Sequence, residues 1–246
     1  MKILLNGIGG RMGKEVTRRV LDGYKETTLV CGVDGFGAEA PVPCYKSFDL
    51  VTEDVDCVID FSHHSLTAPL LAFCKQKKLP VVIATTGQTE EEKEKIRKAS
   101  LEIPVFFSGN MSIGIALLIV LAKKAASVFP DADVEIVETH HNRKLDVPSG
   151  TALMLAEAID SVREGLRRVL GRSGMQKREK NDIGIHAIRM GNVIGRHEVI
   201  VGTDTQTITL THEAHDRALF AEGAITAALF LADKPAGYYT MQDMVK

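Results

Sequence analysis

The stretch that decides the fold stands at the start of the chain and reads Ile3-Leu-Leu-Asn-Gly-Ile-Gly-Gly-Arg-Met-Gly13. Its apolar residues indicate a short buried strand, and its glycines indicate a tight turn. Met12, Val16 and Val20 then recur every four residues, as they would on one face of a helix. A strand, a glycine-rich turn and a helix in this order form the fingerprint of a dinucleotide-binding unit. The stretch therefore predicts an α/β domain with a parallel sheet.

Each glycine of the turn has a chemical reason to be there. Gly7 permits the sharp turn, Gly9 and Gly10 let the backbone approach a pyrophosphate, and Gly13 lets the helix pack on the strand. The amides at the start of the helix favour phosphate groups. A glycine cluster alone could be an ordinary turn, but the strand and helix around it favour a cofactor site. The residues expected to contact the cofactor are Gly7, Ile8, Gly9, Gly10, Arg11 and Met12.

Asp34 bears on which cofactor is used. It ends the second apolar run, Thr28–Val33, and stands 21 positions after Gly13. A carboxylate there would accept hydrogen bonds from the ribose 2′-hydroxyl of NADH, and it would repel the 2′-phosphate of NADPH. The sequence thus favours NADH, whereas Arg11 in the phosphate turn could reach a 2′-phosphate and leaves NADPH as the alternative.

Strands and helices continue to alternate through the first half. Apolar runs at Cys57–Phe61, Val81–Ala84 and Val105–Phe107 predict strands, and helical patterns cover Ser65–Lys77 and the segment from Thr89 to Ser100. Such alternation implies a parallel sheet with helices on both faces, whose ligands bind beyond the carboxyl ends of the strands. The small or polar residues expected to line the cofactor groove there are Ala84, Thr85, Thr86, Ser108, Gly109, Asn110 and Met111.

The second half follows a different pattern, which begins near Met111. A long apolar helix and a strand precede a dense polar loop and a helix from Ala152, and Arg163–Lys180 is expected to form a helix end and a mobile surface loop. Strand-like runs without intervening helices then indicate a smaller α+β domain with an open mixed sheet. The elements expected here are the helices Ser112–Phe129 and Ala218–Ala232 and the strands Val134–Val137, Ile183–Arg189, His197–Val201 and Thr205–Thr211.

The composition excludes several classes of protein. The 246 residues are 45% hydrophobic and 25% charged, with a net charge of −2, which is ordinary for a globular protein and gives no basic surface for nucleic acid. No apolar run approaches the roughly 20 residues that cross a bilayer. The first strand follows Met1-Lys2 directly, which leaves no room for a signal peptide, and the four cysteines have no CxxC spacing. We therefore expect a cytoplasmic protein without membrane contact.

The densest chemistry lies in Glu138-Thr-His-His-Asn-Arg-Lys-Leu-Asp-Val-Pro-Ser-Gly-Thr-Ala152. Its two cations and the helix that begins near Thr151 both favour a negatively charged small molecule, and its two imidazoles titrate near neutral pH. Adjacent histidines beside Glu138 suit tetrahedral zinc poorly, and no HExxH pattern is present, so no metal is expected.

These motifs together resemble the dihydrodipicolinate reductase family, nearly end to end. The pattern H-H-x-x-K-x-D-x-P-S-G-T is highly specific to that family. The resemblance implies NAD(P)H-dependent reduction of 4-hydroxy-tetrahydrodipicolinate to tetrahydrodipicolinate, in the diaminopimelate route to lysine. The segments that carry it are Gly7–Gly13, Ile59–Ser62, Ala84–Gly87, Asn110–Ser112, Glu138–Ala152 and His212–Arg217.

The resemblance also assigns roles within the dense loop. It implies that His140 exchanges a proton at the substrate ring, and that Lys144 is a second proton donor or stabilises the developing anion. His141 and the backbone of Gly150 and Thr151 would hold the carboxylates of the dianionic substrate. Asp146 would orient the loop.

The resemblance further implies a domain arrangement and an assembly. The last helix would return to the first domain, giving a dinucleotide-binding domain of residues 1–111 and 218–246 and a substrate-binding and oligomerisation domain of residues 112–217. Members of the family are homotetramers that assemble through the sheet of the second domain.

Departures from the family pattern are few, and none touches the proton-transfer residues. Val147 stands where Ala or Ser is usual, Ala116 where Asn is common, and Met190 where Gly is frequent. Arg143 is as readily a solvated neighbour as a ligand contact. Several histidines have no assigned role. Of these, His63 and His64 are interpreted as surface or groove-lining residues, and His212 and His215 as structural or subunit-contact residues.

Two rival functions remain. A reductase of another small acid, such as an aspartate dehydrogenase-like enzyme, would share the glycine turn but lack the His-His-x-x-Lys loop. A regulatory protein that binds NAD(P)H without turnover would usually have lost the reactive residues. The intact His140, Lys144 and Gly150-Thr151 argue against both.

Overall fold

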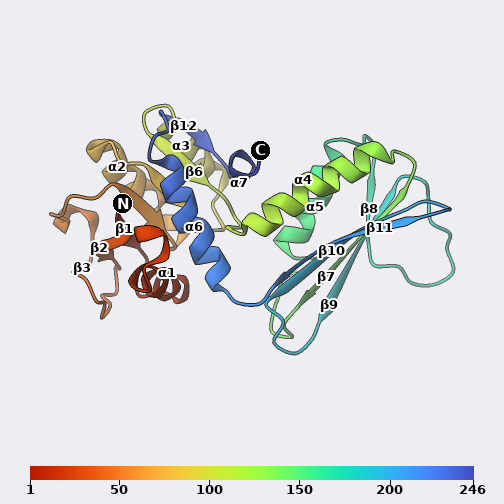
Figure 1. Ribbon diagram of the computed structural model, residues 1–246, viewed down its shortest axis with the longest axis horizontal. Coiled ribbons are helices and arrows are strands. Elements are labelled where there is room, and N and C mark those ends of the chain that lie inside the picture. Colours follow the sequence, from red (N-terminus) through yellow and green to blue (C-terminus); the bar gives the residue numbers. More distant parts are fainter. The chain divides into compact units, whose positions relative to one another are not determined.

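The computed structural model describes all 246 residues and divides into two compact units (Figure 1). The last two residues aside, the first unit comprises Met1–Ile113 and Arg217–Met244, and the second comprises Gly114–Asp216. None of the helices has the length and apolar character that crossing a bilayer requires.

A parallel sheet of seven strands forms the centre of the first unit, in the order β12-β6-β5-β4-β1-β2-β3. The chain starts in the middle, builds outward to β3 and then crosses back to β4, so the order reverses between β1 and β4. This confirms the Rossmann-like fold. The strands are β1 (Lys2–Asn6), β2 (Thr28–Val33), β3 (Cys44–Tyr45), β4 (Cys57–Asp60), β5 (Val81–Ile83), β6 (Pro104–Phe107) and β12 (Gly237–Tyr239). Sequence patterns missed β3 and β12, because edge strands of two or three residues are too short to show a period.

Helices cover both faces of this sheet. Residues of α2 and α3 join one apolar core with strand residues, and α1 and α6 pack against each other, with α6 also on β4, β5 and β6. The capping box predicted before α3 is present, since Thr89 Oγ accepts from Glu92 N at 3.2 Å and Glu92 Oε2 accepts from Thr89 N at 2.8 Å. The helices are α1 (Arg11–Leu21), α2 (Thr67–Lys77), α3 (Glu90–Ala99), α6 (Ala218–Leu231) and α7 (Met241–Met244), with short 3₁₀ turns at Tyr24–Glu26, Phe48–Leu50 and His64–Leu66.

The second unit contains a mixed sheet of five strands, in the order β11-β10-β7-β9-β8. Strand β10 is antiparallel to β7 and β11, whereas β9 is parallel to β7 and β8, which confirms the predicted mixed sheet. The strands are β7 (Asp133–His140), β8 (Arg167–Leu170), β9 (Asp182–Arg189), β10 (Gly195–Gly202) and β11 (Thr207–Ala214).

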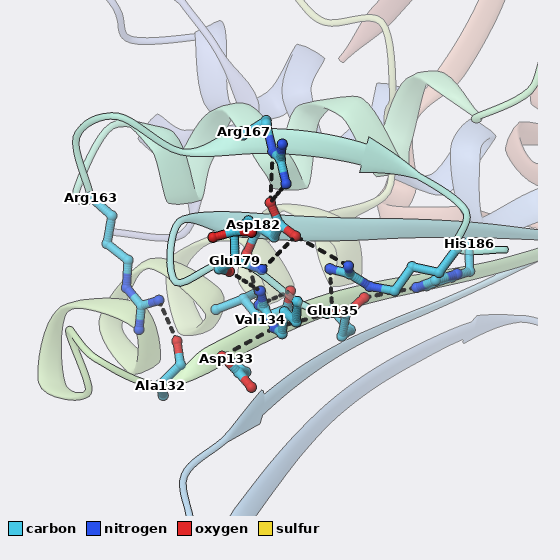
Figure 2. Close-up of polar contacts among 11 residues, drawn as sticks. Ala132, Asp133, Val134, Glu135, Arg163, Arg167, Glu179, Asp182 and His186 are labelled. Atoms are coloured by element: carbon cyan, nitrogen blue, oxygen red, sulfur yellow. Dashed lines mark hydrogen bonds and ion pairs between the residues drawn. The ribbon is translucent and has the colours of Figure 1, made fainter. Parts of the chain in front are cut away.

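Strand β8 corrects the expectation of a helix end and a loop over Arg163–Lys180. Its sequence, Arg-Arg-Val-Leu, shows no alternation of apolar and polar residues, so no strand was predicted. Parallel backbone pairing with β9 makes it an edge strand, and Arg167 Nη2 lies 2.6 Å from the buried carboxylate of Asp182 on β9 (Figure 2).

Helices α4 (Ile113–Val128) and α5 (Gly150–Asp160) supply the apolar residues that pack on one face of this sheet. Serine caps the start of α5, where Ser149 Oγ accepts from Ala152 N at 3.2 Å. Arg163 stabilises the end of α4, because its guanidinium donates to the carbonyls of Ala126 at 3.0 Å and of Phe129. It also donates to the carbonyl of Ala132 at 2.8 Å (Figure 2). Carbonyls at a helix end need such partners, since no helical amide reaches them.

Candidate active site

The glycine turn lies at the carboxyl end of β1 and leads directly into α1. Gly7 has φ +81°, and a Cβ there would lie 2.6 Å from the carbonyl oxygen of Phe61. A Cβ on Gly13 would lie 2.2 Å from the carbonyl oxygen of Gly7. Only glycine fits at either position. The predicted contact residues Gly7–Met12 thus form a close-packed turn whose free helix amides can receive phosphates.

Asp34 packs directly on this turn. Its Oδ2 accepts from Gly9 N at 3.1 Å, and its Oδ1 accepts from Phe36 N at 3.1 Å. A Cβ on Gly9 would lie 2.7 Å from Oδ2, so the carboxylate and the backbone are in contact. Asp34 therefore stands where an acidic residue can bind the adenine ribose.

A buried carboxylate links the strands at the point where the sheet order reverses. Asp60 Oδ1 accepts from Asn6 Nδ2 at 2.7 Å and from Ser62 Oγ at 2.6 Å, which ties the end of β1 to the end of β4. Asp60 is 2% exposed. Burial raises its pKa, and the hydrogen bonds to the carboxylate offset this rise only in part. The sequence motif Ile59–Ser62 drew attention to these residues without giving them this role.

The loops after β5 and β6 hold the other predicted cofactor residues. Thr86 and Gly109 are exposed and Asn110 is half-buried, whereas buried residues complete the set: Ala84, Thr85, Ser108 and Met111. Ser108 Oγ donates to the Asn110 carbonyl at 2.7 Å, which fixes the second loop. The exposed members can meet a ligand, and the buried ones shape the loops.

His63 and His64 begin the segment that leads into α2. His64 Nδ1 lies 3.0 Å from Glu92 Oε2, and His63 Nδ1 lies 2.9 Å from Ser65 Oγ. Both imidazoles thus hold the starts of helices. No group of three or more His, Cys, Asp or Glu side chains is arranged to hold a metal ion.

In the second unit, His140 is the last residue of β7. The strand runs past the predicted Val134–Val137, so this imidazole is held by the sheet and not by a loop. It is 8% exposed, and its Nδ1 lies 2.5 Å from Glu138 Oε2.

Glu138 is completely buried, and Arg189 of β9 binds it with two nitrogens. Nη1 donates to Oε2 at 2.8 Å, Nη2 donates to Oε1 at 2.7 Å, and Ser149 N also donates to Oε1 at 3.0 Å. Burial opposes ionisation, but the hydrogen bonds from His140 and Arg189 outweigh it and lower the pKa of Glu138 to about 2. The site therefore contains an ionised carboxylate at neutral pH.

His197 of β10 is a further buried imidazole beside His140. The two ring centroids are 5.1 Å apart, edge to face, and His197 Nε2 lies 3.2 Å from Ser149 Oγ. His197 is 4% exposed, and burial, followed by the charge of His140, lowers its pKa to about 3. It is neutral at working pH.

Sequence reasoning missed the positions of Arg189 and His197 in this site. Register explains both, because parallel pairing puts Arg189 opposite His140, and antiparallel pairing puts His197 opposite Glu138. His212 of β11 pairs with His197 in the same row, and burial lowers its pKa. A pattern within a short stretch of sequence cannot predict neighbours that lie so far apart along the chain.

The loop after β7 carries Lys144, whose Nζ lies 2.8 Å from Asp146 Oδ1. The turn is closed by a hydrogen bond from Lys144 N to the His141 carbonyl at 3.1 Å, and His141 N donates to the Val193 carbonyl at 2.7 Å. Arg143 is exposed and donates to Asn192 Oδ1 at 2.6 Å. The loop thus presents one cation, Lys144, next to the buried imidazoles.

Gly150 and Thr151 form the first turn of α5, which begins at Gly150, next to the start that the sequence predicted near Thr151. Apart from its chain neighbours and its own helix, no atom lies within 4 Å of the place where a Cβ on Gly150 would stand, so the space beside Gly150 is open. Helix amides favour an anion at such a place.

Known proteins match the whole of this chain. Residues 1–111 match the family model described as Dihydrodipicolinate reductase, N-terminus, and residues 114–245 match the one described as Dihydrodipicolinate reductase, C-terminus. The chain is 45% identical over 248 residues to the 4-hydroxy-tetrahydrodipicolinate reductase of Caldanaerobacter subterraneus subsp. tengcongensis, a match that covers 100% of this chain and 98% of that one. It is 43% identical over 250 residues to the enzyme of the same name from Clostridium novyi, with the same coverage.

A solved structure matches equally far along the chain. The dipicolinate-bound dihydrodipicolinate reductase from Paenisporosarcina sp. TG-14 is similar with a TM-score of 0.83 and 26% sequence identity, covering 99% of each chain.

Proposed function

This chain belongs to the dihydrodipicolinate reductase family, and we propose which of its residues carry out the family's reaction. That reaction is the NAD(P)H-dependent reduction of 4-hydroxy-tetrahydrodipicolinate to tetrahydrodipicolinate, in the diaminopimelate route to lysine. In this proposal the first unit binds the dinucleotide and the second binds the substrate.

The glycine turn and the loops after β5 and β6 bind the dinucleotide, with Asp34 on the adenine ribose. We propose NADH as the preferred cofactor. The Asp34 carboxylate supports this, because it lies against Gly9 and would repel a 2′-phosphate. When bound, the cofactor supplies the hydride, and every proton must come from the protein or from water.

The dicarboxylate substrate binds at the start of α5. His141 and the amides of Gly150 and Thr151 hold its carboxylates, and Lys144 adds charge-assisted hydrogen bonds. The open space beside Gly150 supports this placement. So does the relative whose structure contains dipicolinate, a planar dicarboxylate.

Proton exchange at the ring is the role of His140, with Lys144 as a second donor or as the charge that stabilises the developing anion. The single observation that carries this assignment is the contact of His140 with the buried, ionised Glu138. Glu138 is fully buried and bound by two nitrogens of Arg189, whereas the other histidine–carboxylate contact of this sheet, His186 with Glu135, is only half-buried. Asp146 orients Lys144 in this proposal.

We further propose a homotetramer built on the sheet of the second unit, working in the cytoplasm. Strand β11 at the sheet edge has alternately exposed residues, which leaves an edge and a face for a second copy. All four cysteines are free thiols, which agrees with a reducing compartment.

One assay tests the reaction against both rivals. Freshly prepared substrate is mixed with the protein and NADH, and the loss of nicotinamide absorbance is followed. We expect steady turnover of this substrate. We expect no turnover with oxaloacetate and ammonia, which are the substrates of an aspartate dehydrogenase. Turnover only with those substrates would favour the first rival, and NADH binding without turnover of either would favour a regulatory protein.

A further inference from the structure

We propose that Glu138 is the positioning residue that fixes His140 as the tautomer with its hydrogen on Nδ1. This leaves Nε2 as the nitrogen that exchanges a proton with the substrate. The inference deepens the proposed function, because it rests on the role of His140 in proton transfer.

The hydrogen bonds of Glu138 determine which nitrogen of His140 is the donor. Oε2 receives His140 Nδ1 at 2.5 Å and Arg189 Nη1 at 2.8 Å, and Oε1 receives Arg189 Nη2 at 2.7 Å and Ser149 N at 3.0 Å. An ionised carboxylate can only accept, so Nδ1 must donate. Since Glu138 is fully buried and Arg189 holds both of its oxygens, it cannot turn away.

The other nitrogen of His140 faces a place from which a side chain is missing. A Cβ on Gly195 of β10 would lie 3.1 Å from His140 Nε2, and Gly195 has none. The neighbouring His197 is neutral and stands edge-on, so it brings no charge to Nε2. When the imidazolium gives up its Nε2 proton to the substrate, the imidazole that remains keeps its Nδ1 hydrogen on Glu138. No rearrangement of the ring is required.

A second cluster on the same strand has the same chemistry and provides an internal control. Glu135 of β7 lies 2.7 Å from His186 Nε2 and 3.5 Å from Arg172 Nη2 (Figure 2). Because side chains alternate along a strand, Glu135 and Glu138 point to opposite faces of the sheet. His186 and Glu135 are only half-buried, and neither is among the residues proposed to meet substrate or cofactor.

The first test locates the hydrogens of His140 in the unaltered protein. Neutron diffraction from crystals of the unaltered protein in heavy water, near pD 8, shows which imidazole nitrogens carry deuterium. We expect deuterium on Nδ1 of His140, and we expect Nε2 to be the bare nitrogen when the ring carries a single deuterium. Deuterium on Nε2 with a bare Nδ1 would overturn the proposal, whatever any variant does.

The second test compares two equivalent substitutions. In Glu138→Gln, an amide nitrogen replaces one of two oxygens that each accept two hydrogen bonds. When this nitrogen faces His140, it donates to Nδ1 and reverses the tautomer. Loss of the residue that sets the tautomer costs about 10⁴ in kcat in a serine protease. We expect kcat to fall at least tenfold here, with the KM for NADH unchanged. Glu135→Gln should keep the kcat of the unaltered protein when sedimentation shows that its assembly is unchanged. Equal losses in both variants, or no loss in Glu138→Gln, would refute the positioning role.

The proton-transfer role of His140 and the positioning role of Glu138 can fail separately. If His140→Gln keeps its kcat while deuterium lies on Nδ1, the proton-transfer role fails and the tautomer assignment stands. If His140→Gln loses activity while deuterium lies on Nε2, the proposed function stands and Glu138 does not position the ring as inferred.

Discussion

At the residue scale, the arrangement that matters is a buried ionised carboxylate holding an imidazole. Glu138 would be costly to bury alone, and Arg189 together with Ser149 N compensates for its lost water. The same bonds hold His140 in one orientation. Pre-organised groups of this kind lose no time and no free energy to reorientation during reaction.

Replacing His140 with Gln should lower kcat by about 10²-fold or more, the usual scale for losing a general acid. NADH affinity should barely change, because the proposed cofactor residues belong to the other unit. Steady-state kinetics and calorimetric titration with NADH check both. His186→Gln, which alters a histidine of the same sheet, is the matched control and should keep its kcat. A near-normal kcat in His140→Gln would contradict the proton-transfer role, and His140 and His141 would then serve only to bind the substrate carboxylates.

Asp34 should make NADH the better cofactor, with a lower KM than NADPH. The charge of Asp34 repels the 2′-phosphate of NADPH. Asp34→Asn keeps the shape of the side chain but removes its charge, so it should narrow the difference in KM between NADH and NADPH. Values of kcat/KM for both cofactors at one ionic strength provide the comparison. A clear NADPH preference in the unaltered protein would contradict the assignment.

At the element scale, β10 shapes the space beside His140. A Cβ on Gly195 would lie 3.1 Å from Nε2 of His140, which is a tight contact, whereas the backbone conformation there does not require glycine. Gly202, at the other end of β10, has only an ordinary contact at 3.9 Å from Thr207 Oγ1.

Gly195→Ala should therefore lower kcat several-fold or more, because the new methyl group covers or displaces the His140 ring. Gly202→Ala should be close to neutral for kcat, and it controls for a general effect of alanine in this strand. Kinetics of both variants at saturating NADH give the comparison. If Gly195→Ala is as active as Gly202→Ala, the Nε2 side of the ring is not where the substrate reacts.

At the scale of the whole molecule, stability should decrease on mild acidification. His197 has a folded pKa of about 3, below its usual 6.5, so between these values the unfolded chain binds a proton that the folded protein does not. Stability from this residue is therefore present above pH 6.5 and is lost as the pH falls towards 3. The slope is up to about 1.4 kcal/mol per pH unit for one proton. Glu138 acts in the same direction only below about pH 4.5, since its folded pKa is about 2.

Urea unfolding at one protein concentration, at pH 7.5, 6.5, 5.5 and 4.5, measures this dependence. His197→Gln should remove much of the slope between pH 6.5 and 4.5, where Glu138 is ionised in both states. An unchanged slope in that variant would mean that His197 is protonated in the folded protein.

Assembly also belongs to the whole molecule. We expect sedimentation at micromolar concentration to give a homotetramer of the 26.8 kDa chain. The second unit supplies a sheet whose second face and β11 edge are available for pairing. A monomer as the sole species would contradict the tetramer.

The sequence by itself determined the Rossmann-like unit and the chemistry of the dense loop. Both follow from neighbouring residues: Gly7 has the positive φ of a tight turn, Gly13 packs against the carbonyl of Gly7 six residues before it, and Ser149 caps the helix that follows it. Local periodicity and local capping act within one or two turns of chain, so they can be read along the sequence.

Only the tertiary structure decided the partners of His140. Arg189 is 51 residues from Glu138 along the chain, His197 is 48 from Ser149, and Gly195 shows no local reason to be glycine. Strand β8 was missed for the same reason, since it is defined by its pairing with β9. Strand register brings these residues together, and register is set by which strands pair across the whole sheet, which no short window of sequence contains.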